Sequence, residues 1–253
     1  SPIMMEQNAC SNPVTPGQTK WSLWNDAETT TTYAAMARLH TRLQPYFEVL
    51  AQEAHDTGAP LMRHPFLTNP EGVDARNGDD ECFLGASLFA APVVRRHERI
   101  KDVWLPPGRY VDLDDGAVYD ARGEGAGGDD GLHTAIEAPL DKLPLLLVEG
   151  HMVPMLDASV TTLAELPADA PLQATTVVTP SMVADRIDVV AAIGPEGSAR
   201  MRLTDGTVLS IEQANAPNDA LVDAGGPSPA DETLRCVVCV GTVRLGRVAR
   251  LRA

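Results

Sequence analysis

Two cysteines, Cys236 and Cys239, have the spacing that most invites a redox or zinc interpretation in this sequence. They lie inside the valine-rich run TLRCVVCVGTVRLGRV, whose alternation is typical of β-strands. A redox CxxC motif sits where a strand gives way to a helix, and the sequence offers no second CxxC or paired histidines to complete a zinc site. We therefore expect core cysteines, no metal ion and no cofactor.

The other residues able to do chemistry form no recognisable constellation. The six histidines are scattered without the spacing of metal ligands, and none has an evident partner for general base catalysis. The glycine-rich loop ARGEGAGGDDG, residues 121–131, has no lysine, and its acidic side chains would repel a phosphate. We interpret this loop as a hairpin tip and not as a nucleotide site.

A long amphipathic helix is predicted over residues 28–57, where apolar residues recur at spacings of three and four. Asp26 is a suitable N-cap, while Gly58 and Pro60 end the helix. Pro45 interrupts the pattern, which predicts a kink or two abutting helices.

Apolar runs flank this helix on both sides. Residues 1–5 read SPIMM, and residues 61–67 resemble a short buried strand. Strand, helix and strand make a βαβ unit, which cannot cover both faces of its own parallel sheet. We expect partner strands from elsewhere, and we expect the natural chain to begin upstream of Ser1.

Beyond Pro70 the sequence is a series of short strands separated by turn signals, which is typical of an antiparallel sandwich. A further β segment starts near residue 163. It contains the hairpin turn Thr204–Thr207, with sequence TDGT.

The formal net charge of −15 argues against nucleic acid and anionic membranes as partners, because such a surface repels phosphates. No segment reaches the roughly 18 apolar residues that a spanning helix needs. Aromatic residues are only 4% of the chain and stop at Tyr119, which disfavours a sugar-stacking module. The sequence indicates no compartment.

Four motifs, in order along the chain, resemble those of glycoside hydrolase family 31, the group of α-glucosidases and α-xylosidases. They are RLQPYFEVLAQEAHDTGAPLMRHPFL (42–67), GDDECFLGASLFAAPVV (78–94), IKDVWLPPGRYVD (100–112) and APLDKLPLLLVEGHMVP (138–154). The resemblance covers roughly residues 1–156.

This resemblance implies a mainly β fold with an α/β N-terminal piece. Residues 1–77 would be the last elements of a (β/α)8 barrel, 78–160 a proximal antiparallel β-sandwich and 161–253 a smaller distal β domain. It also implies a retaining α-glycosidase acting on α-glucoside-like substrates. The two catalytic aspartates would lie upstream of Ser1, so this chain holds no catalytic residue of its own, and its partners would be a carbohydrate and the missing N-terminal part of the barrel.

Three residues are implied to contact substrate. In the family pattern FxPxxRxH, an arginine and a histidine touch the sugar; here Met5 and Gln7 occupy those positions. The run TKWSLWNDAETTTTYAAMAR resembles a sulfoquinovosidase pattern and places Trp24 at the position of a sugar-contacting tyrosine. A sulfoquinovosidase-like member of the family is thus one alternative, and a non-catalytic module that binds a partner protein is another. For Asp79, Asp80 and Glu81 the resemblance implies a structural role.

Overall fold

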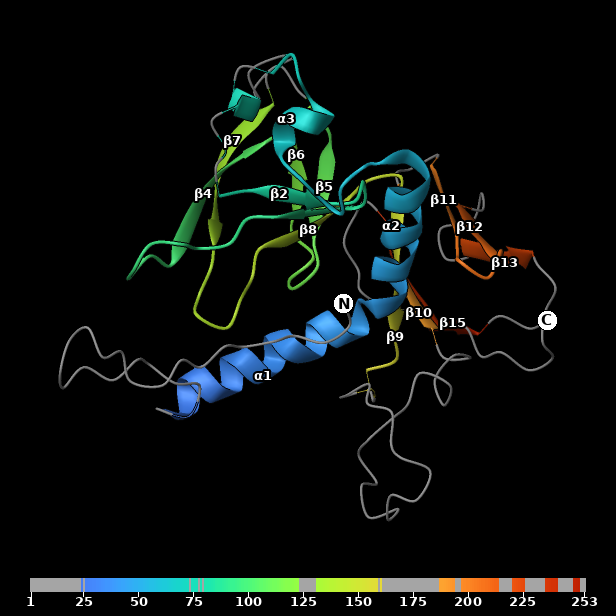
Figure 1. Cartoon of the computed structure of the whole chain (residues 1–253), viewed down its shortest axis with the longest axis horizontal. Helices are drawn as coiled ribbons and strands as arrows, with labels where there is room; N and C mark the ends of the chain where they lie inside the picture. The colour runs from blue at the N-terminus through green and yellow to red at the C-terminus, as the bar shows by residue number, and fades with distance from the viewer. Residues whose placement is uncertain are drawn as a thin grey trace, which may run out of the picture.

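We describe a computed structural model of the chain for residues 24, 26–72, 74–76, 78, 80–122, 131–158, 160, 187–193, 197–213, 220–225, 235–240 and 248–250. From residue 212 onward the description covers the backbone alone. The expected fold class is confirmed, because the described chain is mainly β-strand with helices near its N-terminal side (Figure 1).

The predicted helix is present as two abutting helices, α1 (Ala27–Arg42) and α2 (Gln44–Thr57). Asp26 caps α1 by accepting a hydrogen bond from the Thr29 backbone N–H at 2.6 Å. Pro45 lies in the first turn of α2, where its missing N–H costs no helical hydrogen bond. Gly58 ends α2 with a φ of 78°, a left-handed conformation that favours glycine. Each of these local predictions is confirmed.

The expected buried strand at residues 61–67 is wrong. The segment holds a two-residue strand, β1 (Met62–Arg63), followed by the short helix α3 (Pro65–Thr68). β1 pairs antiparallel with the next strand along the chain, and most of the segment is not buried. Pro65 lacks a backbone N–H and fits the first turn of a helix, which explains why the strand stops.

A six-stranded antiparallel sheet follows, with the order β1-β2-β3-β8-β5-β6. Its further members are β2 (Cys82–Leu84), β3 (Leu88–Ala90), β5 (Arg109–Asp112), β6 (Val118–Asp120) and β8 (Leu145–Val148). A second, two-stranded sheet of β4 (Ile100–Leu105) and β7 (Leu132–Glu137) packs on it. The predicted sandwich is confirmed.

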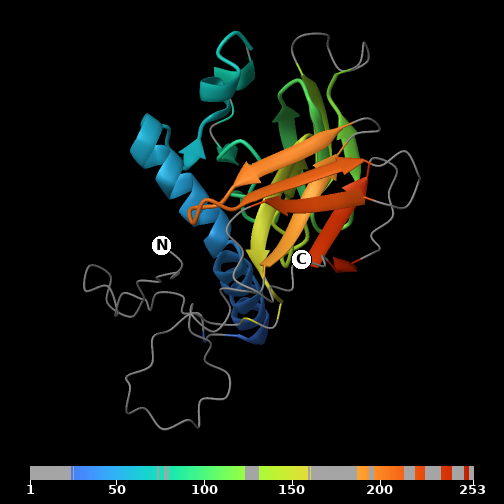
Figure 2. The same ribbon diagram turned by 90° about the vertical axis from the view of Figure 1, so that its right-hand side faces the viewer.

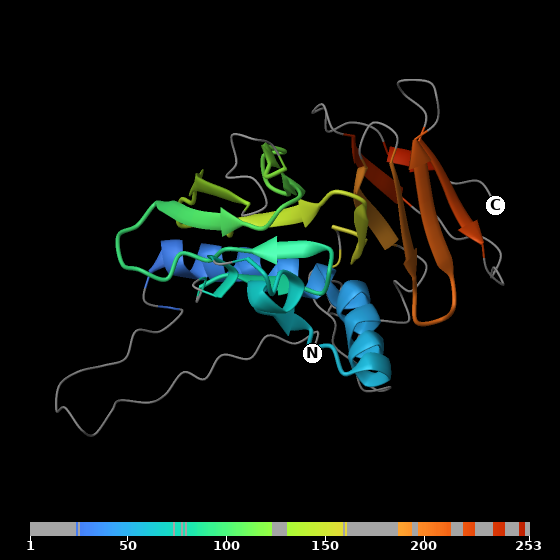
Figure 3. The same cartoon turned by 90° about the horizontal axis from the view of Figure 1, so that it is seen from above.

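Both faces of the six-stranded sheet are covered, and β8 shows how. Leu146 joins the core between the two sheets, together with Phe89 and Leu105. Leu145 and Leu147 point to the opposite face, where they pack against α2. This explains the continuous apolar run of β8, since a strand buried on both faces has no need of alternation. Figure 3 shows the helices lying along this face of the strands.

The remaining strands form two more sheets (Figure 2). One has the order β15-β14-β10-β9 and contains β9 (His151–Leu156), β10 (Ile187–Ile193), β14 (Arg235–Val240) and β15 (Val248–Arg250). The other contains β11 (Ser198–Arg202), β12 (Val208–Gln213) and β13 (Ala220–Gly225). Buried side chains of β9, β10, β11 and β12 share one core.

Two predictions for this region are confirmed by the strand pattern. Cys236 and Cys239 lie within strand β14, as their valine-rich surroundings indicate. Thr204–Thr207 form the hairpin turn between β11 and β12, where Gly206 has a φ of 93°. The domain boundaries at 77/78 and 160/161 stay predictions. β9 precedes the second boundary, yet it pairs antiparallel with β10 beyond it.

None of the helices in the described part of the chain is both long enough and apolar enough to cross a lipid bilayer.

Candidate functional site

Of the three residues expected to contact a sugar, the structure describes one. Met5 and Gln7 lie outside the described residues. Trp24 lies two residues before the N-cap of α1, and 77% of its surface is exposed. An indole in that position is accessible to a ligand, but its exposure does not identify one. The roles of Met5, Gln7 and Trp24 therefore stay predictions.

The residues of the family-like motifs form instead a buried junction between α2 and the β2–β3 hairpin. The Tyr46 hydroxyl donates to the Leu84 carbonyl at 2.6 Å and accepts from the Ser87 backbone N–H at 3.2 Å. Burial raises the pKa of Tyr46, so the hydroxyl keeps its proton and its donor role. A helix side chain thereby satisfies two backbone groups of the hairpin turn.

Gly85 makes this close approach between helix and hairpin feasible. Its φ is 60°, and a Cβ at this position would overlap the Leu50 side chain and lie 2.5 Å from the Tyr46 hydroxyl. The Gly85 N–H also donates to the Leu61 carbonyl at 2.8 Å, which holds the segment after α2 against the turn. Only glycine combines this backbone conformation with this lack of space.

Other motif residues tie β1 to the same junction. The Arg63 guanidinium pairs with the Glu53 carboxylate of α2 at 2.7 Å, and its Nε donates to the Pro60 carbonyl. His64 caps α3, since its Nδ1 accepts from the Phe66 backbone N–H at 3.2 Å. These contacts are between parts of the scaffold, and none leaves a nucleophile facing a base.

Two of the three consecutive acidic residues, Asp80 and Glu81, share one cation. The Lys101 ammonium of β4 lies 3.6 Å from Asp80 and 3.7 Å from Glu81 Oε1. This agrees with the structural role that the resemblance implies; Asp79 lies outside the described residues. Burial raises the pKa of Glu81, and the nearby Lys101 offsets part of that shift. Glu81 Oε2 is buried and has no hydrogen-bond partner among the described residues.

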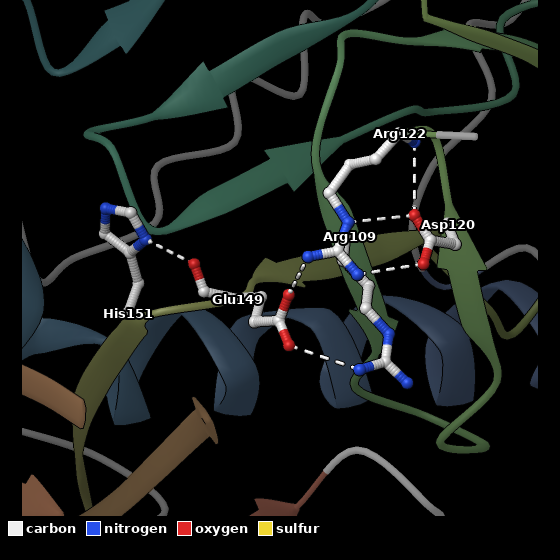
Figure 4. A network of polar contacts seen from close by, with 5 residues as sticks. All are labelled: Arg109, Asp120, Arg122, Glu149 and His151. Atoms are coloured by element: carbon white, nitrogen blue, oxygen red, sulfur yellow. Dashed lines mark hydrogen bonds and ion pairs between the residues drawn. The ribbon is translucent and has the colours of Figure 1, made fainter. Parts of the chain in front are cut away.

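A network of ion pairs that sequence reasoning missed ties β5, β6 and the turn after β8 (Figure 4). Glu149 accepts from Arg109 at 3.2 Å and from Arg122 at 3.1 Å, and Arg122 also pairs with Asp120 at 2.9 Å. The hydrogen bonds from Arg122 lower the pKa of Asp120 to about 2. Glu149 is far from the other members in sequence, so no local signal announces the network.

A second missed cluster is more deeply buried. Lys142 pairs with Asp112 at 2.9 Å and with Asp115 at 2.8 Å, and the Asp112 side chain is fully buried. Burial alone would lower the pKa of Lys142, but its bonds to Asp115 and Asp112 outweigh this and raise it. The cluster joins strand β5 to the segment that leads into β8, again as a structural contact.

Two cavities open on the described surface. An apolar groove of about 710 Å³ runs between the helices and the sandwich, with Leu39 and Phe47 on one side and Val93 and Leu140 on the other. A smaller cavity of about 450 Å³, which we call the acidic pocket, is lined by Asp74, Gly78, Glu81, Asp102, Val103, Trp104, His133 and Thr134. Within the described ranges, no three of His, Cys, Asp and Glu are grouped so that they could hold a metal ion.

The similarity to known proteins falls on the region that contains the junction and the sandwich. Residues 58–153 match the model of the glycosyl hydrolase family 31 C-terminal domain. The chain is 32% identical to an alpha-glucosidase of Hordeum vulgare over 124 residues, and 30% identical to alpha-glucosidase 2 of Bacillus thermoamyloliquefaciens over 125 residues. Each alignment covers 49% of this chain but only 14% and 15% of the respective relative.

Solved structures show the same fold over a longer stretch. The cycloalternan-forming enzyme from Listeria monocytogenes, solved in complex with a pentasaccharide substrate, aligns with a TM-score of 0.66 at 22% identity, covering 88% of this chain and 20% of that one. The Flavobacterium johnsoniae GH31 dextranase aligns with a TM-score of 0.63 at 21% identity, covering 88% and 27%.

The chain thus spans about a seventh of the curated relatives and up to about a quarter of these solved chains. The matched segment contains the junction glycine Gly85, the Lys101 ion pairs and every strand of the sandwich. The sequence motifs and the family match agree: residues 58–153 of this chain carry the C-terminal domain of glycoside hydrolase family 31.

Proposed function

We propose that this chain is the C-terminal part of a retaining α-glycosidase that hydrolyses O-glycosidic bonds of α-glucoside-like substrates. The observation that carries the proposal is the match of half of the chain to two α-glucosidases. In a retaining enzyme, one carboxylate attacks the anomeric carbon while a second carboxyl, about 5 Å away, protonates the leaving oxygen. Water then hydrolyses the glycosyl-enzyme intermediate. Both carboxyls belong to a preceding part of the chain.

The role of the described residues in this proposal is to brace a barrel. Their surface supports that role, since Met62 and Leu67 of the β1–α3 segment are 64% and 58% exposed. Apolar side chains gathered on one segment are typical of a surface that another part of the protein covers. The missing N-terminal part of the barrel is the partner that the proposal assigns to this face.

A comparison of two chains tests the proposal. Residues 1–253 alone should not cleave p-nitrophenyl α-D-glucopyranoside, whereas the product of the in-frame coding sequence extended upstream should cleave it and release the α-anomer first. Activity of residues 1–253 alone, or release of the β-anomer first by the extended protein, would show that the proposal is wrong. If the coding sequence had a start codon immediately before Ser1, the alternative of a non-catalytic module that binds a partner protein would replace this proposal.

Substrate contacts from Gln7, Met5 and Trp24 are part of the same proposal. In the extended protein, Gln7→Ala should raise KM for the glucoside, while Gln52→Ala on the exposed side of α2 should leave KM unchanged. Equal effects of the two substitutions would remove Gln7 from the site. Trp24→Phe, assayed with an α-glucoside and with a sulfonated sugar glycoside, tests the sulfoquinovosidase-like alternative, which no observation on the described residues favours.

A further inference from the structure

The acidic pocket lies on the side of the sandwich formed by β4 and β7. Strands β4 and β7 supply Asp102, Val103 and Trp104 on one side and His133 and Thr134 on the other. The short helix η1 (Asp74–Arg76) supplies Asp74. Figure 1 shows β4 and β7 beside the segment that carries α3.

Three carboxylates line this pocket, and they are poorly compensated. Asp74 contacts the His133 imidazole at 2.9 Å. Asp102 is exposed on β4 and has no ion pair among the described residues. Lys101 is the cation next to Glu81, but it is shared with Asp80. One lysine therefore balances only part of the negative charge that surrounds the cavity.

Glu81 gives an independent indication that a partner is missing. Its side chain is only 6% exposed, yet Oε2 makes no hydrogen bond within the described part of the chain. Buried carboxylate oxygens are normally satisfied, because an unpaired one costs its full desolvation free energy. Gly78 borders this oxygen, and a Cβ at that position would lie 2.9 Å from it. The absence of a side chain at Gly78 leaves the space beside Oε2 open.

The chemistry of the lining indicates which ligand fits. Ionised carboxylates only accept hydrogen bonds, so they select a donor with positive charge. Among the described residues, no three His, Cys, Asp or Glu side chains are grouped so that they could hold a metal ion. A volume of about 450 Å³ suits an organic group.

We propose that the pocket lined by Asp74, Glu81, Asp102 and His133 binds an organic cation through a guanidinium or ammonium group. The group is carried either by a small free molecule or by an arginine or lysine side chain of a polypeptide. This site is independent of the proposed glycosidase activity, and it is tested without any measurement of hydrolysis.

The test is a titration of residues 1–253 with methylguanidinium chloride at constant ionic strength, followed by NMR on the backbone amides of Val103, Trp104 and Thr134. Saturable shifts should appear, with half-saturation on the order of 1–10 mM for a small cation held by partly exposed carboxylates. Asp102→Asn should weaken binding about threefold or more. Asp114→Asn, an exposed carboxylate outside the pocket with the same charge change, should leave binding unchanged.

Glu81→Gln is a second variant, which should also weaken binding if the protein stays folded. A blocked Gly-Arg-Gly peptide separates the two sources: tighter binding than methylguanidinium assigns the site to a polypeptide side chain, and equal binding assigns it to a free cation. D-Glucose should cause no shift at these amides. The proposal is overturned if neither cation gives saturable shifts, if Asp102→Asn and Asp114→Asn weaken binding equally, or if the neutral sugar binds and the cations do not.

Discussion

Two neighbouring regions differ in how far their apolar side chains are exposed. One is the junction between α2 and the β2–β3 hairpin, and the other is the β1–α3 segment, which follows α2 in the chain. At the junction, Tyr46 and Leu50 are 1% and 3% exposed. On the neighbouring segment, Met62 and Leu67 are 64% and 58% exposed. The junction is complete within this chain, whereas the segment presents a surface that our proposal assigns to the rest of the barrel. The contrast predicts where substitutions should be costly.

Gly85→Ala, at the junction, should reduce the stability of the protein the most. The new methyl group would overlap Leu50 at a backbone φ of 60°, so the free energy of unfolding should fall by about 3 kcal/mol or more. Gly150→Ala is the matched control, because Gly150 has a φ of 81° but a methyl group there would meet nothing within 4 Å. It should cost about 1 kcal/mol. Urea unfolding measures both, and equal losses would show that the junction is not tightly packed.

Lys142→Met should have the next largest effect. It should lower the free energy of unfolding by about 3 kcal/mol, because it leaves the Asp112 carboxylate buried and unpaired. The double variant Lys142→Met with Asp112→Asn should recover part of the loss, since the buried charge is then absent. Arg122→Met in the exposed network with Asp120 should cost less than about 1 kcal/mol. If the two single variants were equally stable in urea, burial would not be what distinguishes the clusters.

Tyr46→Phe should lower the free energy of unfolding by about 1–2 kcal/mol, because the Leu84 carbonyl and the Ser87 N–H both lose their partner. The ring still fills its place in the core, so the effect should be smaller than that of Gly85→Ala. Tyr119→Phe, in a half-buried tyrosine away from α2, is the control in the same unfolding experiment. A loss as small as that of the control would mean that the hydroxyl does not hold the hairpin.

Leu67→Ser and Met62→Ser should have the smallest effect, within about 0.5 kcal/mol in residues 1–253, because these side chains are already exposed to water. In the protein extended upstream, the same substitutions should cost clearly more if the barrel covers this face. Thermal unfolding of both proteins provides the measurement. Unchanged stability in the extended protein would argue against this face as the site of contact.

Much of the local structure was predictable from the sequence. Asp26, Pro45 and Gly58 act within one helical turn of their own position, so their effect on helix boundaries is visible in a short window. The strands of the sandwich were indicated by short runs separated by turn residues, and TDGT indicated the hairpin between β11 and β12. The motifs also led to the family, because their order along the chain is itself part of the sequence.

The predicted strand at residues 61–67 failed because a short apolar run does not reveal whether it is covered. The segment holds the two-residue edge strand β1, which pairs with β2 of the hairpin and not with a parallel neighbour, and Pro65 then begins the short helix α3. The ion-pair network of Arg109 and Glu149 was invisible for a related reason. Arg109 and Glu149 are 40 residues apart in sequence, and the pairing of β5 with β8 brings them together.

Helices α1 and α2 with their ends, the strand-rich character of the chain after Pro70, and the family resemblance could be derived from the sequence, because each depends on residues that are close together or on their order. Three features became visible only in the folded chain: Gly85 leaves room for side chains of α2, Lys142 neutralises the buried Asp112, and Asp74, Glu81 and Asp102 line one pocket. The physical reason is that burial and charge compensation depend on distances between atoms of different elements, and those distances exist only once the sheets have packed.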